Sequence, residues 1–275
     1  MTTTDPQASD TSDDVFRALN GAAEAIWLDN HATWPDVSVE VLPSIDSTNT
    51  ALMRRARVGQ HQPVVLMAVT QTAGKGRSGK AWESPAGDSL SFSVGLPMAA
   101  DAPLSGLSLA IGLALAEKLT PRAHIKWPND LWVDQQKLAG ILIEVATLGH
   151  TRFVVVGVGL NIQTPQLLHP TAAAVPPIGL RDVTGDPALD IGETAAHCVN
   201  QVFAAFTHFT ESGFSSLIER YADRDALRDV AVRLSDGTTG TARGVTAAGA
   251  LRLERADGTM VDIISQEVSV RPCAT

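Results

Sequence analysis

The sequence predicts an α+β protein with a mixed, largely antiparallel sheet, packed helices and a small C-terminal β-barrel. Along residues 37–228, helix-like and strand-like segments alternate, and several β-rich runs follow one another across short turns. From residue 229 onward, short alternating runs are separated by Asp236-Gly237, Ala248-Gly249 and Asp257-Gly258, which favour tight turns. A chain of 275 residues is long enough for one large core and a small second domain.

Residues 1–36 are predicted to form a tail and one short helix. Residues 1–14 are rich in Thr, Ser and Asp and have little to bury, so we expect them to be disordered. The helix follows from four apolar residues on one face, Val15, Leu19, Ala22 and Ile26. One helix is too little for a winged helix-turn-helix, so no DNA-reading domain is expected here.

The central part of the chain, residues 37–228, is predicted to form the main domain. Ser47 is placed to cap a helix that runs through residues 52–57. The strands expected from apolar alternation or β-rich composition are 37–41, 63–70, 89–94, 130–133, 138–145 and 152–158. A helical stripe is formed by Leu104, Leu107, Ile111 and Leu115. After a loop with Pro165, Pro170, Pro176 and Pro177, two further helices are expected, one from Ile191, Ala195, Cys198, Val202 and Phe206 and one from Phe214, Leu217 and Tyr221.

The last part of the chain, residues 229–275, is predicted to form the barrel. Its short alternating runs are 231–234, 238–245, 250–253, 259–264 and 268–270. A closed antiparallel arrangement of such short strands leaves few unpaired edges, which is why a small barrel is expected.

Composition and charge restrict the class of function. The formal net charge of −9 argues against a broad nucleic-acid surface or a polybasic membrane surface. The richest apolar run, 107–119, is too short to span a bilayer, and no signal peptide is evident. From these observations we expect no membrane and no nucleic-acid partner. Cys198 and Cys273 lie far apart without metal-type spacing, so we expect a reducing, cytoplasmic location.

A cationic, glycine-rich segment stands out at residues 74–80, Gly-Lys-Gly-Arg-Ser-Gly-Lys. It satisfies the dinucleotide fingerprint and, except for its last residue, the P-loop pattern. Both patterns require a helix directly after the loop, but residues 81–88 are turn-rich and Ala81 replaces the hydroxyl that a P-loop uses for magnesium. We therefore interpret the segment as a different kind of phosphate-binding loop.

Four separated segments carry a family resemblance. They are Asp-Ser-Thr-Asn at 46–49, the stretch 71–82, Lys-Trp-Pro-Asn-Asp at 126–130 with Lys-Leu-Ala-Gly at 137–140, and Gly-Val-Gly-Leu-Asn-Ile at 157–162. In order and spacing they resemble the biotin protein ligases (biotin-[acetyl-CoA-carboxylase] ligases), over residues 37–272. The combination of Lys-Trp-Pro-Asn-Asp with Lys-Leu-Ala-Gly is the most specific part of the match.

The resemblance implies a fold, a reaction and a partner. It implies a biotin/lipoate ligase-like catalytic domain at 37–228, an SH3-like β-barrel at 229–275, and the monofunctional form without a DNA-binding domain. The implied enzyme joins biotin to ATP, with Mg²⁺ as activator, to form biotinyl-5'-AMP and pyrophosphate. It then passes biotin to one lysine of the biotin carboxyl carrier domain of a carboxylase. A homodimer is left open.

The resemblance also implies site residues. Lys137, Arg77, Asp130 and Lys75 are expected to act in catalysis. The three cations suit this role because positive charge placed around a reacting polyanion stabilises the transition state, and Asp130 is expected near the phosphate and magnesium or the acceptor lysine. The biotin-binding residues are expected to be Ser47, Thr48, Asn49, Gln71, Lys75, Gly76, Arg77, Lys137, Gly140, Gly157 and Gly159. The ATP or adenylate side is expected to comprise Gly74, Arg77, Trp82 (stacked on adenine), Asn129, Asp130, Lys137 and Asn161, with Asp130 as the candidate metal ligand.

The chain departs from the family pattern at two places. The family usually has Gly-Arg-Gly-Arg-Arg-Gly-Arg in the glycine loop, whereas this chain has Lys75, Ser78 and Lys80. Since lysine lacks the bidentate fork of arginine, we expect somewhat leakier retention of the adenylate. The C-terminal Gly-Glu-Val-Ser motif is altered at 265–271, and no ATP contact is assigned to Arg271.

Structural explanations compete with each motif taken alone. Trp127 and Trp132 suit a core, Ser47 suits a helix cap, and residues 157–161 suit a strand end. Two other functions also stay open. A lipoate-protein ligase would share the core and the adenylate chemistry, and a biotin or adenylate sensor would bind without turnover.

Overall fold

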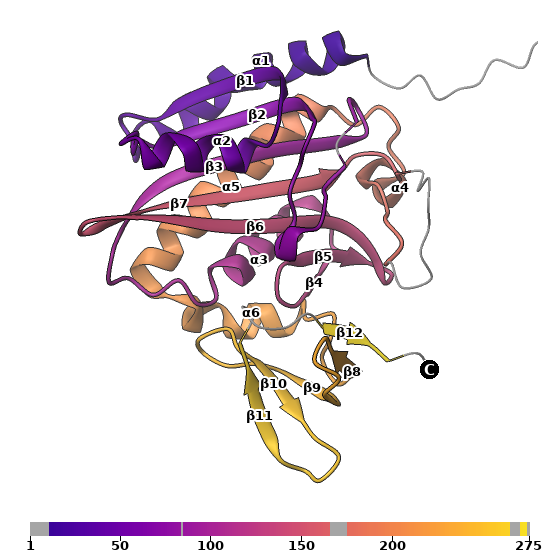
Figure 1. Cartoon of the computed structure of the whole chain (residues 1–275). Coiled ribbons are helices and arrows are strands. Elements are labelled where there is room, and N and C mark those ends of the chain that lie inside the picture. Colours follow the sequence, from indigo (N-terminus) through magenta and orange to yellow (C-terminus); the bar gives the residue numbers. More distant parts are fainter. Residues whose placement is uncertain (1–10, 84, 166–174, 265–269, 274–275) are drawn as a thin grey trace, which may run out of the picture.

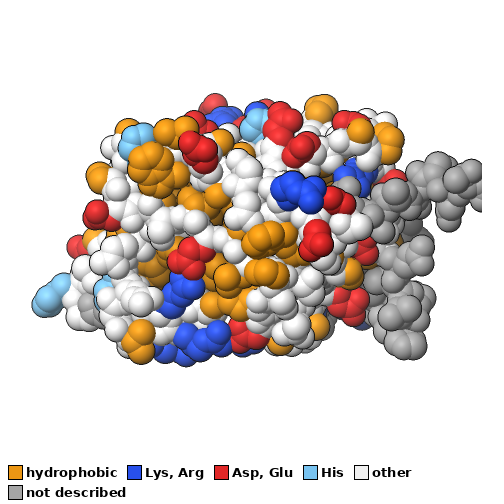
Figure 2. Space-filling model, turned by 90° about the horizontal axis from the view of Figure 1, so that it is seen from above, with side chains coloured by type: hydrophobic (Ala, Val, Ile, Leu, Met, Phe, Trp, Pro, Cys, Tyr) orange, Lys and Arg blue, Asp and Glu red, His pale blue; other side chains and the backbone are white. Residues whose placement is uncertain are grey.

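The computed structural model describes residues 11–83, 85–165, 175–264 and 270–273, and these form two sheets with packed helices (Figure 1). The predicted α+β class is confirmed: a large mixed sheet carries helices on its faces, and an antiparallel sheet follows at the C-terminal end. On the part of the surface visible in Figure 2, acidic and basic side chains are interspersed with hydrophobic ones. Within the described ranges, no helix has the length and apolar character needed to cross a bilayer.

The large sheet has the strand order β1-β2-β3-β7-β6-β5-β4. Strands β1 and β2 run parallel, and the other neighbouring strands run antiparallel. The expected strands all form, and the short β4 is an addition that three residues of sequence could not signal. The bounds are β1 Ser38–Ile45, β2 Val64–Gln71, β3 Ser89–Ala99, β4 His124–Lys126, β5 Asp130–Val133, β6 Gln136–Leu148 and β7 Thr151–Asn161.

The register of the central strands places small residues side by side on one face. Gly159 of β7 lies opposite Gly140 of β6 and Ser91 of β3, and Gly157 lies opposite Leu142 and Ser93. Because side chains alternate between the faces of a strand, Gly157 and Gly159 point to the same side. Apart from Leu142, this part of the sheet face therefore forms a floor of small residues.

Helices cover the two faces unequally. Helices α1 (Ser12–Asn30), α3 (Leu107–Leu119) and α5 (Ile191–Ser212) pack on one face over the main hydrophobic core. Helix α2 (Thr48–Arg57) packs on the other face over a smaller cluster, and it covers only part of the sheet (Figure 1). The remaining short elements are η1 Arg77–Gly79, α4 Leu180–Thr184, η2 Phe214–Leu217 and α6 Ile218–Ala222.

Two helix starts differ from the sequence prediction. Residues 12–14, which we assigned to the tail, form the first turn of α1 because the Thr11 side chain accepts from Asp14 N. Residues 1–10 lie outside the described residues. Leu104 precedes α3, which begins only at Leu107 after the left-handed Gly106. The predicted Ser47 cap of α2 is confirmed, since its side chain accepts from Thr50 N (3.4 Å).

The C-terminal sheet is antiparallel with the order β11-β10-β9-β8-β12. Strands β8 to β11 match the predicted runs closely, whereas of the predicted run 268–270 only Val270 is described, where β12 begins. The glycines of the three predicted turns, Gly237, Gly249 and Gly258, all have positive φ. The bounds are β8 Ala231–Leu234, β9 Thr239–Val245, β10 Leu251–Glu254, β11 Met260–Ile263 and β12 Val270–Pro272. Residues 265–269, where the sequence departs from the family motif, lie outside the described residues.

Candidate active site

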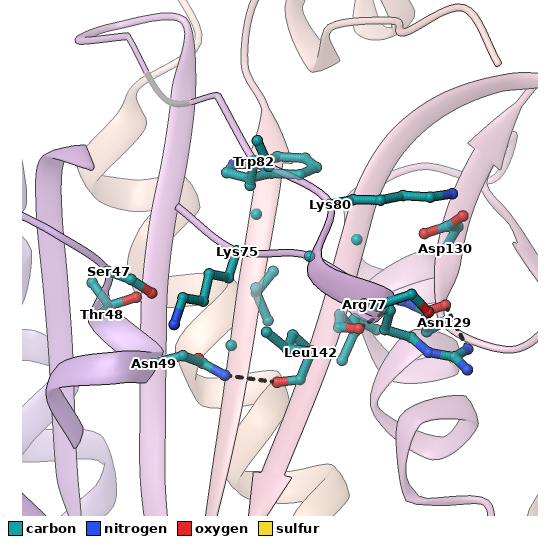
Figure 3. A pocket seen from close by; sticks show the side chains of 18 of the residues that line it. Ser47, Thr48, Asn49, Lys75, Arg77, Lys80, Trp82, Asn129, Asp130 and Leu142 are labelled. Carbon is teal, nitrogen blue, oxygen red and sulfur yellow. Dashed lines mark hydrogen bonds between the residues drawn. The ribbon is translucent and has the colours of Figure 1, made fainter. Parts of the chain in front are cut away.

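A pocket lies over the floor of small residues, between α2, the glycine loop and the β5–β6 hairpin (Figure 3). Most of the predicted site residues line it, namely Ser47, Thr48, Asn49, Gln71, Lys75, Gly76, Arg77, Trp82, Asn129, Asp130, Lys137, Gly140, Gly157 and Gly159. Gly74 and Asn161 are not among the lining residues. The pocket also includes residues to which we had assigned no role: Ser78, Lys80, Ala81, Phe92, Lys126, Pro128, Ile141, Leu142 and Val158.

One end of the pocket is polar and buried, and it is built around the first turn of α2. Gln71 Oε1 accepts from the backbone N–H of Thr48 (2.8 Å) and from its hydroxyl (3.2 Å). Asn49 donates to Leu142 O (3.2 Å) and accepts from the Ser93 hydroxyl (2.6 Å). These bonds hold short polar groups in fixed positions, which suits a small ligand that has both donors and acceptors.

Glu144 does not line the pocket but holds Asn49 at this polar end. Its Oε2 accepts from Asn49 Nδ2 at 3.1 Å, so both hydrogen-bonding ends of the Asn49 amide are engaged. Ser93 and Glu144 were absent from our predicted site. Their only sequence signal is a polar residue inside a strand, and the link to Asn49 depends on the strand register.

Two of the predicted glycines are required by close packing. A Cβ added to Gly157 would lie 2.0 Å from Asn49 Oδ1. A Cβ added to Gly159 would lie 2.3 Å from Cε2 of Trp82. The glycines therefore let Asn49 and Trp82 lie directly against the sheet, where a side chain would displace both.

The glycine loop folds back on itself over the pocket. Trp82 N donates to Gly74 O (2.9 Å), and Lys75 and Ala81 form an antiparallel bridge. The turn at the tip places Ser78 and Gly79 at φ of 55° and 72°. Among the described residues, the next element after η1 is strand β3, which agrees with our rejection of the P-loop and dinucleotide patterns.

The other end of the pocket gathers cations around one carboxylate. Lys137 Nζ lies 2.8 Å from Asp130 Oδ1 and 5.6 Å from the centre of the Trp82 ring. Arg77 donates to Asn129 Oδ1 (3.2 Å), and burial lowers the pKa of its guanidinium from the ordinary value. In Figure 3, Asn129 and Asp130 lie on the opposite side of the pocket from the first turn of α2. The pocket thus has a polar end, toward which the Lys75 amine points in Figure 3, and an end where several cations surround Asp130.

Lys126 is the functional candidate that sequence reasoning left without a role, although it begins the Lys-Trp-Pro-Asn-Asp motif. It is only 7% exposed and lines the pocket from β4. Burial lowers the pKa of its amine from 10.5 to about 8, and Asp130 partly opposes this effect. The nearby cations Lys137, Arg77 and Lys80 lower the pKa further. An incoming anion would reverse this penalty, so Lys126 is suited to bind phosphate.

The backbone of Lys137 is fixed by residues far along the chain. Lys137 N donates to Pro176 O (2.8 Å), and Ile178 N donates to Lys137 O (2.9 Å). Asn161 Nδ2 also donates to Lys137 O (3.0 Å), and Asn161 is buried. The predicted adenylate contact of Asn161 stays a prediction, and in this structure its side chain orients Lys137.

Trp127 and Trp132 belong to the core, as their structural interpretation suggested, since they are 0% and 5% exposed. Ser47 combines both interpretations, because it caps α2 and lines the pocket. The pocket therefore combines a polar chamber at the first turn of α2 with a cationic compartment around Asp130, and Trp82 forms an aromatic wall. This is the arrangement of a protein that holds a small polar ligand next to a polyanion.

Comparisons with known proteins agree with this class. Residues 41–161 match the model of the biotin/lipoate A/B protein ligase family, and residues 228–271 match that of the biotin protein ligase C-terminal domain. The bifunctional ligase/repressor BirA of Salmonella typhimurium is 34% identical over 254 residues, which are 88% of this chain and 77% of that protein. The biotin–[acetyl-CoA-carboxylase] ligase of Mycobacterium tuberculosis is 40% identical over 154 residues, 52% of this chain and 56% of that protein.

Among solved structures, the biotin protein ligase from Aquifex aeolicus in complex with biotin and ATP has a TM-score of 0.71 at 24% identity. The match covers 86% of this chain and 99% of that chain, and it supports the fold. The chain belongs to the biotin/lipoate A/B protein ligase family. Within that family, its C-terminal domain and its curated relatives group it with the biotin protein ligases.

Proposed function

We propose that this protein is an ATP-dependent biotin protein ligase of the biotin-[acetyl-CoA-carboxylase] type. One observation carries the proposal: a single pocket joins the buried polar chamber at the first turn of α2 to the cationic compartment around Asp130. The chamber suits the ureido ring of biotin, which offers N–H donors and a carbonyl acceptor. The cationic compartment suits a triphosphate, and Trp82 between them offers an aromatic face to adenine.

In the first step, a biotin carboxylate oxygen attacks the α-phosphorus of ATP. A bond forms between that oxygen and the phosphorus, and the bond from the α-phosphorus to the bridging oxygen breaks, so that pyrophosphate leaves. Two anions must approach each other, so positive charge already in place lowers the barrier. Lys137 is held by Asp130 and by its clamped backbone, and it supplies such a charge without reorganisation.

In the second step, the amine of an acceptor lysine attacks the carbonyl carbon of biotinyl-5'-AMP. An amide bond forms, the bond from the carbonyl carbon to the phosphate oxygen breaks, AMP leaves, and the amine releases a proton. We propose a biotin carboxyl carrier domain as the acceptor. The glycine loop over the pocket would protect the mixed anhydride from water in the interval.

Magnesium fits this pocket as an ion that arrives with the nucleotide. Among the described residues there is no group of three or more His, Cys, Asp or Glu side chains that could hold a metal ion. Mg²⁺ in nucleotide enzymes is commonly held by one or two carboxylates and by the substrate phosphates. Of the described residues that line the pocket, Asp130 is the one with a carboxylate, and the ion would neutralise charge on the departing pyrophosphate.

The test is biotin-dependent exchange of pyrophosphate into ATP, with purified protein and magnesium and with lipoate as the parallel substrate. We expect exchange with biotin and none with lipoate. Exchange with lipoate alone would move the protein to the lipoate ligases, and exchange with neither would indicate a sensor. Transfer is then tested by mass spectrometry of a carrier domain and of its lysine-to-arginine variant.

As part of the same proposal, we place the protein in the cytoplasm, where its acceptor and ATP would be found. Both cysteines are free thiols, and Cys198 is buried in the core. Free cysteines are the expected state in a reducing compartment.

A further inference from the structure

The turn between β9 and β10 in the C-terminal sheet contacts the active-site motif directly. The Trp127 side chain is fully buried, and its indole Nε1 donates to Gly249 O at 3.0 Å. Trp127 lies between Lys126 and Pro128, which both line the pocket. The described residues of the C-terminal sheet, within 231–264 and 270–273, are not among those that line the pocket, so this contact joins them to the pocket indirectly.

The turn is seated tightly against the start of α3. Gly249 has φ +75°, and a Cβ added to it would lie 2.7 Å from the Cα of Gly106. From the first turn of α3, the Ser108 hydroxyl donates to Pro128 O at 2.9 Å. The turn, the start of α3 and the 127–128 segment therefore form one packed unit, in which a shift of the turn moves the motif.

The linker at residues 224–226, which leads to the C-terminal sheet, makes a second contact near the Lys126 motif. Ile125 N donates to Arg224 O (2.7 Å), and Ala226 N donates to Ile125 O (3.0 Å), so the linker pairs with the outer edge of β4 (Figure 1). Strand β4 has three residues and lies at the edge of the large sheet, so its own hydrogen bonds are few. The position of Lys126 thus depends on two contacts from beyond residue 223.

We propose that the Gly249 turn is a positioning element of the active site, which fixes Lys126 and Asn129 through Trp127 and so sets the affinity for the nucleotide. This inference rests on the proposed function, because it assigns the cationic end of the pocket to ATP. Neither Gly249 nor Trp127 would touch the substrate. The polar chamber is built from α2, β2, β3 and β6, so the biotin end should not respond to this contact.

The chain contains a matched pair of turns for the test. Gly249 N donates to Thr246 O, and Thr246 N donates to Ala250 O; Gly258 N donates to Arg255 O, and Arg255 N donates to Thr259 O. Gly258 has φ +80°, but nothing lies within 4 Å of a Cβ added there. Gly249→Ala and Gly258→Ala therefore strain similar turns in one sheet, and only the first disturbs the motif.

The dissociation constants for ATP with Mg²⁺ and for biotin are measured separately by calorimetry on the full chain, together with the Tm. We expect Gly249→Ala to weaken ATP binding by about tenfold and to change biotin binding less than twofold. Gly258→Ala should lower the Tm and leave both constants unchanged. If the two variants gave the same pattern, or if Gly249→Ala weakened biotin and ATP equally, the positioning role would be wrong.

A second variant removes the donor of the Trp127–Gly249 hydrogen bond. Trp127→Phe removes the indole donor and keeps most of the aromatic volume, so we expect the same selective loss of ATP affinity. Trp34→Phe is its control, because Trp34 Nε1 is buried without a hydrogen-bond partner in the described structure and packs on Phe203 and Phe206. An unchanged ATP constant in Trp127→Phe would overturn the proposal. ATP binding is measured without turnover, whereas the proposed function is tested by pyrophosphate exchange. A failure of the positioning role can therefore be distinguished from a failure of the proposed function.

Discussion

Replacing Lys126 with methionine should make the protein more stable and less active at the same time. Lys126 is 7% exposed, and burial lowers the pKa of its amine from 10.5 to about 8. At pH 7 the folded protein therefore holds a buried, protonated amine at an energetic cost. Methionine has a similar unbranched length and no charge, so it fills the same space without that cost.

The magnitude follows from the pKa difference. At about 1.36 kcal/mol per pH unit, a change from 10.5 to about 8 corresponds to roughly 3 kcal/mol of unfolding free energy at pH 7. Between pH 8 and 10.5 the unfolded state binds more protons than the folded state, so the stability of the wild type rises with pH relative to the variant. The advantage of Lys126→Met should thus be complete below about pH 8 and nearly absent at pH 10.5.

The assay is urea denaturation of both proteins at pH 7 and at several values up to 10.5, with unchanged m-values as the check on two-state unfolding. Lys80→Met is the control, because Lys80 lines the same pocket but is exposed, and its unfolding free energy should change by less than about 0.5 kcal/mol. Pyrophosphate exchange by Lys126→Met should fall by about a hundredfold. No stabilisation at pH 7, or a gain that persists unchanged to pH 10.5, would refute the reasoning.

Four further substitutions test individual roles. Lys137→Ala should reduce pyrophosphate exchange by about 10²–10³-fold with an unchanged Tm, and full activity would remove this lysine from the mechanism. Trp82→Ala should weaken ATP by about tenfold and biotin much less, measured by calorimetry, and equal losses would contradict adenine stacking. Gly157→Ala places a Cβ 2.0 Å from Asn49 Oδ1 and should weaken biotin by at least about tenfold, while unchanged biotin affinity would show that Asn49 is dispensable. Lys75→Arg should slow release of biotinyl-5'-AMP, and an unchanged rate in a filter-binding chase would rule out the leakage predicted for lysine.

Local chemistry explains why much of the fold could be predicted. Ser47 caps α2 because a hydroxyl before a helix satisfies its own neighbouring N–H groups. The turns at Gly237, Gly249 and Gly258 form where glycine permits positive φ. Such signals are complete within a few residues, whereas β4 has only three residues and is stabilised by the distant linker, so it had no readable signal.

The site residues that could be predicted are those that lie in short contiguous sequence motifs. The segments 46–49, 74–82, 126–130 and 137–140 each keep their chemistry together, and the structure brings them into one pocket. Ser93 and Glu144 could not be found in this way. They meet Asn49 across separations of 44 and 95 residues, which the strand register alone defines.

By itself, the sequence determined the α+β class, the two sheets, the family and the motif residues, because these depend on periodicity and on short strings. Only the tertiary structure decided that Lys126 is a buried amine, that Asn161 and Pro176 orient Lys137, and that the Gly249 turn supports Trp127. Burial, pKa and hydrogen-bond partners are properties of groups brought together by packing. They depend on the full set of neighbours in space, and a linear sequence does not contain that set in readable form.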